Sequence, residues 1–142
     1  MIEVTEELRK ELSDIHNADT TKLAYIGDSV YEVFIRLKSA EACGRRAGDM
    51  NRYSVRYVKA DSQAAAAKGL MKEDGRFLTD EEAQLFKRAR NRTNTSHPRG
   101  STPTEYKLAT GFEAVIGWLY VRGDGERLSE IVDEAVRIID SY

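Results

Sequence analysis

Two stretches that are almost free of charged side chains constrain the fold of this chain most. They cover residues 23–31 and 108–121, in a chain in which 32% of all residues are charged. Both have the apolar spacing and length of helix segments, and no stretch of useful length alternates in the manner of a β-strand. Helices with so little charge need a packing partner, because burial of their apolar side chains stabilises them. The sequence therefore predicts an all-α fold in which such helices are packed.

Capping residues and turn residues predict where the other helices lie. We expect a helix that opens at 5–8 and ends near 13–17, helices over roughly 21–40, one or two between 50 and 71, helices over about 80–92 and 103–121, and a last amphipathic helix after Gly125. Thr79 with Glu82 and Thr102 with Glu105 form two capping boxes, in which a hydroxyl and a carboxylate three residues later satisfy free backbone N–H groups. The helix over 21–40 is expected to bury a stripe spaced by three and four residues, made up of Leu23, Ile26, Val30, Phe34 and Leu37.

Length and composition favour one soluble domain that spans residues 1–142. The single cysteine, Cys43, has no intrachain disulfide partner, and it is expected to be a half-buried structural residue. The N-terminus is acidic and does not resemble a signal peptide, and the longest apolar run is too short to cross a bilayer. We therefore expect a cytoplasmic protein with no membrane partner.

The net charge of −2 conceals an uneven distribution of charge. No acidic residue occurs from Ala83 to Thr104, where the basic residues are Lys87, Arg88, Arg90, Arg92 and Arg99. A second basic group comprises Arg45, Arg46, Arg52, Arg56 and Lys59, and only Asp49 opposes it. Such asymmetry is typical of a face that binds a polyanion. The first group, which runs out of a helix into a polar loop, is interpreted as an RNA-binding segment that contacts phosphates.

Each of the two nearly uncharged stretches contains one acidic residue, Asp28 in the first and Glu113 in the second. An ionised carboxylate among apolar side chains costs free energy unless a cation meets it. If the two helices pack together, the acids can share a divalent ion such as Mg²⁺, which prefers oxygen ligands and bridges to phosphate. The residues alone leave open an alternative, in which each acid pairs with an arginine such as Arg36 or Arg122.

Other catalytic chemistry finds little support in the sequence. His16 is followed by Asn17, His97 is followed by Pro98, and two histidines with one cysteine give no zinc-binding spacing. The glycines between Gly44 and Gly48 lack the lysine and hydroxyl of a phosphate-binding loop. The tyrosines and Trp118, at helical spacing, are more typical of a core than of a base-stacking surface.

Two motifs in this chain resemble those of a known family. The stretch Leu23-Ala24-Tyr25-Ile26-Gly27-Asp28-Ser29-Val30 resembles the signature of the ribonuclease III catalytic domain, and Phe112-Glu113-Ala114-Val115-Ile116-Gly117 resembles its second motif. The whole chain is similar to Mini-ribonuclease III, the branch that lacks a double-stranded-RNA-binding domain.

This resemblance implies a homodimer of ribonuclease III helical domains with a valley for double-stranded RNA. Each protomer would cut one strand with Mg²⁺ and leave 5′-phosphate and 3′-hydroxyl ends. Asp28 and Glu113 match the catalytic, metal-binding acids of the two motifs. The branch acts in maturation of large-subunit (23S) ribosomal RNA, so its precursor is the expected substrate.

The chain also departs from the broader family at three positions. Ribonuclease III usually has acidic residues where this chain has Thr21, Ala24 and Thr110, and these changes are typical of the branch. They leave open how many metal ions bind and whether water replaces the missing ligands. Glu32, one turn from Asp28, is expected to support the site without binding the metal directly.

Two other functions remain as alternatives. One is a non-catalytic RNA-binding or ribosome-assembly module on the same fold, which would bind duplex RNA in a salt-dependent way without cleaving it. The other is a helical dimerisation scaffold without affinity for RNA. The sequence does not indicate the cleavage site, an accessory partner, or which basic residues touch RNA.

Overall fold

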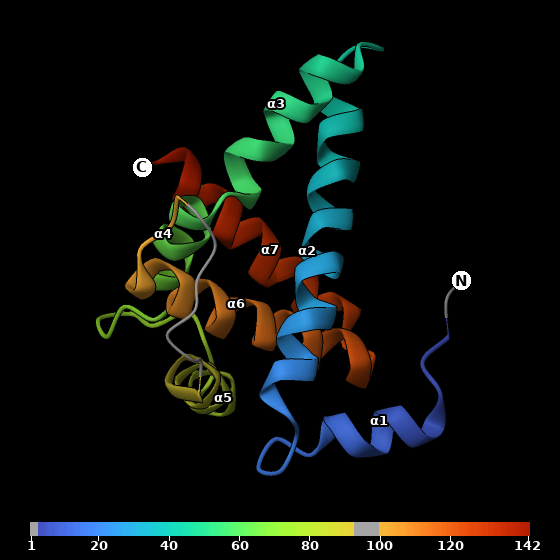
Figure 1. Cartoon of the computed structure of the whole chain (residues 1–142), viewed down its shortest axis with the longest axis vertical. Helices are drawn as coiled ribbons and strands as arrows, with labels where there is room; N and C mark the ends of the chain where they lie inside the picture. The colour runs from blue at the N-terminus through green and yellow to red at the C-terminus, as the bar shows by residue number, and fades with distance from the viewer. Residues whose placement is uncertain (1–2, 93–99) are drawn as a thin grey trace.

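The computed structural model describes residues 3–92 and 100–142, which form seven α-helices and no β-strand (Figure 1). The all-α prediction is therefore confirmed. The helices are α1 (Glu6–Ser13), α2 (Thr20–Ala42), α3 (Ala47–Val58), α4 (Ala60–Leu70), α5 (Asp80–Arg92), α6 (Pro103–Arg122) and α7 (Gly125–Asp140). Within these ranges, no helix combines the length and the hydropathy that a membrane-spanning segment requires.

Both predicted capping boxes are present. At the start of α6, the Glu105 backbone N–H donates to Thr102 Oγ1 at 3.1 Å, and the Thr102 N–H donates to Glu105 Oε1 at 3.0 Å. Thr79 and Glu82 make the same two bonds at 3.2 and 2.9 Å before α5. These bonds satisfy backbone donors that lack a partner within the helix, and they set the helix starts.

The segment between residues 50 and 71 is divided into two helices at Lys59. Its ψ of 154° is extended, so α3 ends there and α4 begins in a new direction. Two bonds across the break fix this geometry: Ser62 Oγ donates to Arg56 O at 2.6 Å, and Gln63 Nε2 donates to Val58 O at 2.8 Å. The first turn of α4 is thereby held beside the end of α3.

A close crossing of α2 and α6 organises the fold, and Figure 1 shows α6 passing across the lower half of α2. A Cβ atom on Gly27 would overlap the Glu113 carbonyl oxygen and would lie 2.9 Å from the Gly117 nitrogen. A Cβ atom on Gly117 would overlap the Leu23 carbonyl oxygen. The two backbones are therefore in direct contact, and only glycine fits at these two positions.

This crossing corrects the predicted apolar stripe of α2. The face that is buried carries Leu23, Gly27, Tyr31 and Ile35, while Leu37 is 63% exposed. The prediction failed because it followed large apolar side chains, whereas the closest contact of the helix is made through glycine. Ile26, Val30 and Phe34, the rest of the predicted stripe, are only partly buried at the edge of the core.

One hydrophobic cluster joins the helices around this crossing. Phe112 and Tyr31 meet edge to face, with ring centroids 4.9 Å apart, and Tyr31 donates its hydroxyl to Tyr57 O at 2.9 Å. Trp118 is buried and its Nε1–H donates to Ser13 O at 3.0 Å, which ties α6 to the end of α1. Trp118 is therefore a core residue, as predicted, and Cys43 is half-buried.

Candidate active site

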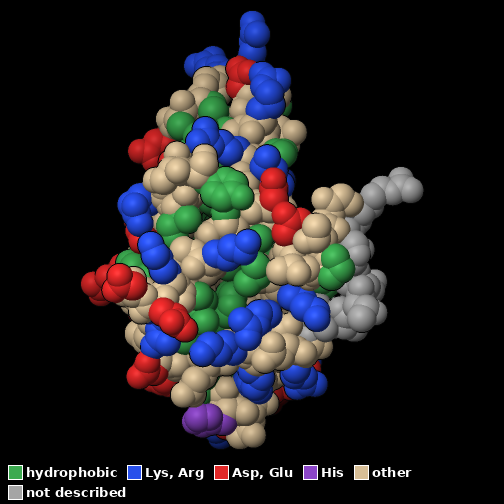
Figure 2. All heavy atoms as spheres, turned by 90° about the vertical axis from the view of Figure 1, so that its left-hand side faces the viewer, with side chains coloured by type: hydrophobic (Ala, Val, Ile, Leu, Met, Phe, Trp, Pro, Cys, Tyr) green, Lys and Arg blue, Asp and Glu red, His purple; other side chains and the backbone are tan. Residues whose placement is uncertain are grey.

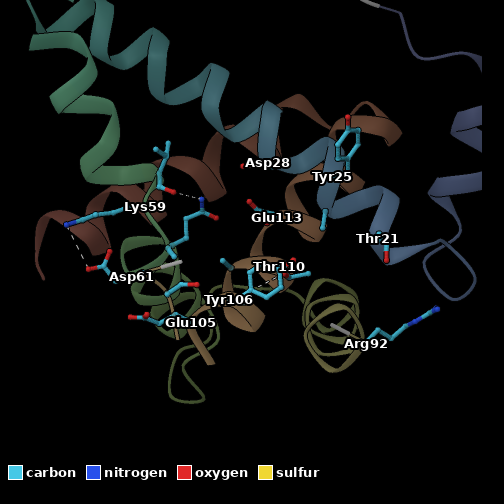
Figure 3. Close-up of a pocket in the computed structure, with 17 residues that line it drawn as sticks. Thr21, Tyr25, Asp28, Lys59, Asp61, Arg92, Glu105, Tyr106, Thr110 and Glu113 are labelled. Atoms are coloured by element: carbon cyan, nitrogen blue, oxygen red, sulfur yellow. Dashed lines mark hydrogen bonds and ion pairs between the residues drawn. The ribbon is translucent and has the colours of Figure 1, made fainter. Parts of the chain in front are cut away.

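The crossing of α2 and α6 brings Asp28 and Glu113 together. The Gly27 backbone lies against the Glu113 backbone, so the next residue of α2, Asp28, lies beside the Glu113 side chain. Figure 3 shows the two carboxylates as neighbours between α2 and α6. Two acids that are 85 residues apart in the sequence (113 − 28) thus form a pair.

The environment of this pair favours a neutral form of one of its members. Burial raises the pKa of Glu113 to about 9, and the Asp28 carboxylate adds to the rise by its charge and by a hydrogen bond that favours the protonated acid. Two carboxylates in contact cannot both be ionised cheaply without a cation nearby. The metal-free pair is therefore destabilised at neutral pH.

The arginines that the sequence offered as alternative partners pair elsewhere. Arg36 binds Glu32 at 2.9 Å, and the Arg122 guanidinium lies 4.6 Å from the centroid of the Trp118 ring. Among residues 3–92 and 100–142, neither Asp28 nor Glu113 has an ion-pair partner. The arginine-pairing alternative is thus not supported for the part of the chain that the structure describes.

The carboxylate pair lines a pocket of about 890 Å³ between α2, α4, α5 and α6. Thr21, Ala24 and Thr110, at which ribonuclease III usually has acids, line the same pocket. The three substitutions therefore change the site itself, and Asp28 and Glu113 remain next to each other without those carboxylates. The other lining residues include two cations, Lys59 and Arg92, and two acids, Asp61 and Glu105.

The predicted RNA-binding residues are dispersed over α5. Only Arg92 lines the pocket, while Lys87 is exposed outside it. Arg88 donates to Ile15 O at 2.7 Å and to His16 O at 3.3 Å, so it holds α5 against the segment after α1. Arg90 donates to Asn91 Oδ1 at 3.2 Å. Arg99 lies outside the described residues.

Glu32 lies one turn beyond Asp28 on α2, but it does not line the pocket. Its carboxylate accepts two hydrogen bonds from Arg36, at 2.9 and 3.3 Å. No contact between Glu32 and a residue that lines the pocket supports the predicted role of Glu32, so this role stays a prediction.

Gln63 is a lining residue that the sequence analysis did not single out. It precedes the alanine run 64–67 and is itself buried. In the sequence, Gln63 follows Asp61 and Ser62, so it belongs to a short polar segment and is not isolated as Asp28 and Glu113 are. It was overlooked because an amide, unlike a carboxylate, carries no charge that would mark it as costly.

Comparison with known proteins decides the family. The model of the ribonuclease III domain matches residues 21–124, a range that contains both carboxylates. This chain belongs to the ribonuclease III family. Its similarity to Mini-ribonuclease 3 of Symbiobacterium thermophilum is 41% identity over 118 residues, which is 83% of this chain and 88% of that protein. Mini-ribonuclease 3 of a Thermoanaerobacter species is 35% identical over 98% of this chain and 94% of its own length.

A solved structure supports the same assignment to the ribonuclease III family. The crystal structure of a protein from Fusobacterium nucleatum superposes with a TM-score of 0.74 at 30% identity, covering 87% of this chain and 96% of that one. The predicted resemblance to the Mini-ribonuclease III branch is therefore confirmed, and the chain is an endoribonuclease of this family. Members of the ribonuclease III family act on double-stranded RNA and generally depend on divalent metal ions.

Proposed function

We propose that this ribonuclease III-family protein cleaves double-stranded RNA with Mg²⁺, using Asp28 and Glu113 as its metal ligands. The observation that carries the proposal is a pair of adjacent carboxylates in a large pocket, without an ion-pair partner among the described residues. A structural acid has its charge compensated by the fold. No cation among the described residues compensates the charge of the Asp28–Glu113 pair, and a metal ion in the pocket would do so.

The donor set fits a hard divalent cation. Mg²⁺ takes oxygen ligands, keeps several of its waters, and is commonly held by one or two protein carboxylates. No cluster of three or more His, Cys, Asp and Glu side chains occurs in the described ranges, so Asp28 and Glu113 would supply the charge alone. When bound, the ion supplies activation of water and neutralisation of charge on the scissile phosphate.

The surroundings of the pocket suit a polyanion. Lys59, at the break between α3 and α4, and Arg92, on α5, lie at opposite sides of the pocket in the close-up (Figure 3). Figure 2 shows Lys and Arg side chains over the middle of the face that carries α3, α4 and α5, with Asp and Glu side chains along the left edge and in a smaller group right of the centre. Such a face can contact the phosphates of an RNA duplex, which is recognised mostly by shape rather than by sequence.

The RNA contacts would come from Lys87, Arg90 and Arg92 on α5, with Arg99 beyond it. Arg88 is bonded to backbone carbonyls, so its contribution would be to position α5. A precursor of large-subunit ribosomal RNA is the proposed substrate, since the Mini-ribonuclease III branch acts on it.

An apolar stripe on α2 supports the proposed homodimer. Tyr25, Val33 and Leu37, spaced by eight and four residues, are 82%, 57% and 63% exposed. Large apolar side chains in a row on one helix are typical of a surface that another protein covers. Tyr25 also lines the pocket, so a second protomer on this stripe would lie next to the active site.

Cleavage of a purified duplex RNA with and without Mg²⁺ tests the proposal. We expect products with 5′-phosphate and 3′-hydroxyl ends only with the metal. Asp28→Asn and Glu113→Gln should each lower the rate by about 100- to 1,000-fold, the scale for losing a preorganised electrostatic contact to the transition state.

Asp74→Asn and Glu126→Gln are matched controls, because both residues are exposed and lie outside the pocket. They should cleave like the unaltered protein. Full activity of Asp28→Asn and Glu113→Gln would contradict the assignment of the ligands. Duplex binding without any product in Mg²⁺ would instead identify a non-catalytic RNA-binding module.

A further inference from the structure

Gln63 has an unpaired carbonyl oxygen at the pocket. The side chain is only 4% exposed, and it lines the pocket together with Asp28 and Glu113. Its Nε2 donates to Val58 O at 2.8 Å, whereas its Oε1 has no hydrogen-bond partner within the described ranges. A buried acceptor without a donor costs about 1–3 kcal/mol, so this oxygen is expected to have a function or a ligand.

The hydrogen bond to Val58 fixes which end of the amide is free. A backbone carbonyl can only accept, so the Gln63 nitrogen must face Val58 O, and the oxygen must point away from it. A rotated amide would set two carbonyl oxygens against each other. Gln63 therefore turns its acceptor oxygen away from Val58, and the bond to Val58 O uses one of the two hydrogens of its nitrogen.

Thr110 shows the same polarity on α6. Its hydroxyl donates to Tyr106 O at 2.9 Å, so its hydrogen is already used inside its own helix. Thr110 also lines the pocket, and its Oγ1 can only accept there. Gln63 and Thr110 are thus two neutral acceptors in a pocket that already contains the Asp28–Glu113 pair.

Hydrogen-bond acceptors that line the same pocket as two carboxylates suit a ligand that carries several donors. The waters that surround a divalent cation are such donors, because the ion orients their oxygens inward and their hydrogens outward. Partners that hold such waters orient a metal and strengthen its binding. A phosphate group does not fit this role, since its oxygens need donors, whereas Gln63 Oε1 and Thr110 Oγ1 can only accept.

We propose that Gln63 is a positioning residue that accepts a hydrogen bond from a water molecule bound to the catalytic metal. It acts with Thr110 and offsets part of the metal binding that acids at positions 21, 24 and 110 would provide. The inference rests on the proposed metal site at Asp28 and Glu113. It explains why an amide with its nitrogen tied to Val58 is buried at the start of α4.

Metal binding without RNA tests this role. Mn²⁺ is the probe, and its free concentration is followed by electron paramagnetic resonance during titration of the protein. Gln63→Met keeps the length of the side chain and removes the acceptor, and it should weaken Mn²⁺ binding by about 10- to 100-fold, the range for losing a partner of a metal ligand. Gln84→Met is the matched control, because Gln84 is exposed on α5 outside the pocket.

A second variant keeps the test decisive if Gln63→Met folds poorly. Gln63→Glu retains an acceptor and adds a negative charge, and it loses the N–H that Val58 O accepts. Because the added charge attracts the ion more strongly than the lost bond positions the side chain, this variant should bind Mn²⁺ at least as tightly as the unaltered protein. Circular dichroism melting of each metal-free variant shows whether it is folded at the temperature of the titration. Weaker Mn²⁺ binding by folded Gln63→Glu would overturn the inference.

Three further results separate this inference from the proposed function. Unchanged Mn²⁺ affinity in folded Gln63→Met, with binding lost in Asp28→Asn, would overturn the role of Gln63 and leave the metal site standing. Slower RNA cleavage by Gln63→Met at unchanged Mn²⁺ affinity would also overturn it, and would indicate a ribose hydroxyl as the donor. Mn²⁺ binding that Asp28→Asn does not weaken would contradict the proposed site and the inference together.

Discussion

A buried acid, Glu82, and a half-buried acid, Glu113, have opposite surroundings in this protein. Glu82, whose side chain is 3% exposed, meets Arg127 in a bidentate pair with bonds of 2.8 and 2.9 Å. It also accepts a bond from the Thr79 backbone at 2.9 Å. Glu113 meets a second acid, Asp28, and has no cation partner in the described ranges. The fold compensates the charge of Glu82 with a cation and does not do so for Glu113 among the described residues.

The pKa values follow this difference. Burial would raise the pKa of Glu82, but the hydrogen bonds from Arg127 and Thr79, and the charge of Arg127, together lower it below its ordinary value. Burial raises the pKa of Glu113, and Asp28 raises it further. Burial alone therefore does not distinguish a structural acid from a functional one. The sign of the neighbouring charge does.

Removing the cation from the compensated site should have the largest effect on stability. Arg127→Met leaves Glu82 buried without its partner, and it should lower the free energy of unfolding by about 3–5 kcal/mol. Urea denaturation measures the change. The double variant with Glu82→Leu should recover part of the loss, because it removes the unpaired charge as well. No recovery would mean that Arg127 acts through its contact with the Phe77 carbonyl or ring instead.

Separating the backbones should disturb the carboxylate pair and leave the Glu82–Arg127 pair intact. Gly27→Ala forces α2 away from Glu113 O and should cost about 1–3 kcal/mol of stability, as overpacking does. RNA cleavage at a temperature where the variant is folded should also fall. Gly48→Ala is the control, since its Cβ would meet only Arg52 Nη1, at 3.8 Å, and it should be neutral or stabilising. Equal effects of the two substitutions would contradict the close crossing.

Neutralising one member of the carboxylate pair should stabilise the metal-free protein. The pKa of Glu113 is about 9 in the folded chain and near 4.5 in the unfolded chain. Between these values only the folded state holds the proton, so stability falls as the pH rises. Glu113→Gln abolishes this loss of stability. The free energy of unfolding of the variant, relative to that of the unaltered protein, should therefore increase from pH 5 to pH 8, by more than about 1 kcal/mol. Urea denaturation in a chelator checks it, and an advantage that shrinks with pH would refute the pairing.

Local signals in the sequence predicted much of the fold. The capping boxes at Thr79 and Thr102 act over three residues, so they could be identified without the tertiary structure. The carboxylates Asp28 and Glu113 were also identifiable, because each is isolated in an otherwise uncharged stretch, 23–31 or 108–121. The two carboxylates are adjacent because α2 and α6 cross at Gly27 and Gly117. From the sequence, this packing of the two helices was only one possibility.

Long-range pairings explain what the sequence could not predict. Glu82 was recognised as a capping residue, but its partner Arg127 lies 45 residues away on α7. The exposure of Leu37 was mispredicted, since α2 packs through glycine where a hydrophobic pattern expects large side chains. Gln63 could be recognised only in the structure, where its buried side-chain oxygen has no hydrogen-bond donor within the described ranges.

The central claim is that the Asp28–Glu113 pair binds a metal cation, whereas the charge of Glu82 is compensated by Arg127 within the fold. Thermal unfolding as a function of Mg²⁺ concentration tests it most directly, because a ligand that binds only the folded state stabilises it, by about 2.7 kcal/mol at 100 times its dissociation constant. Mg²⁺ should raise the melting temperature of the unaltered protein and of Arg127→Met, and should have no such effect on Asp28→Asn or Glu113→Gln. An equal Mg²⁺-dependent rise in Asp28→Asn would contradict the account.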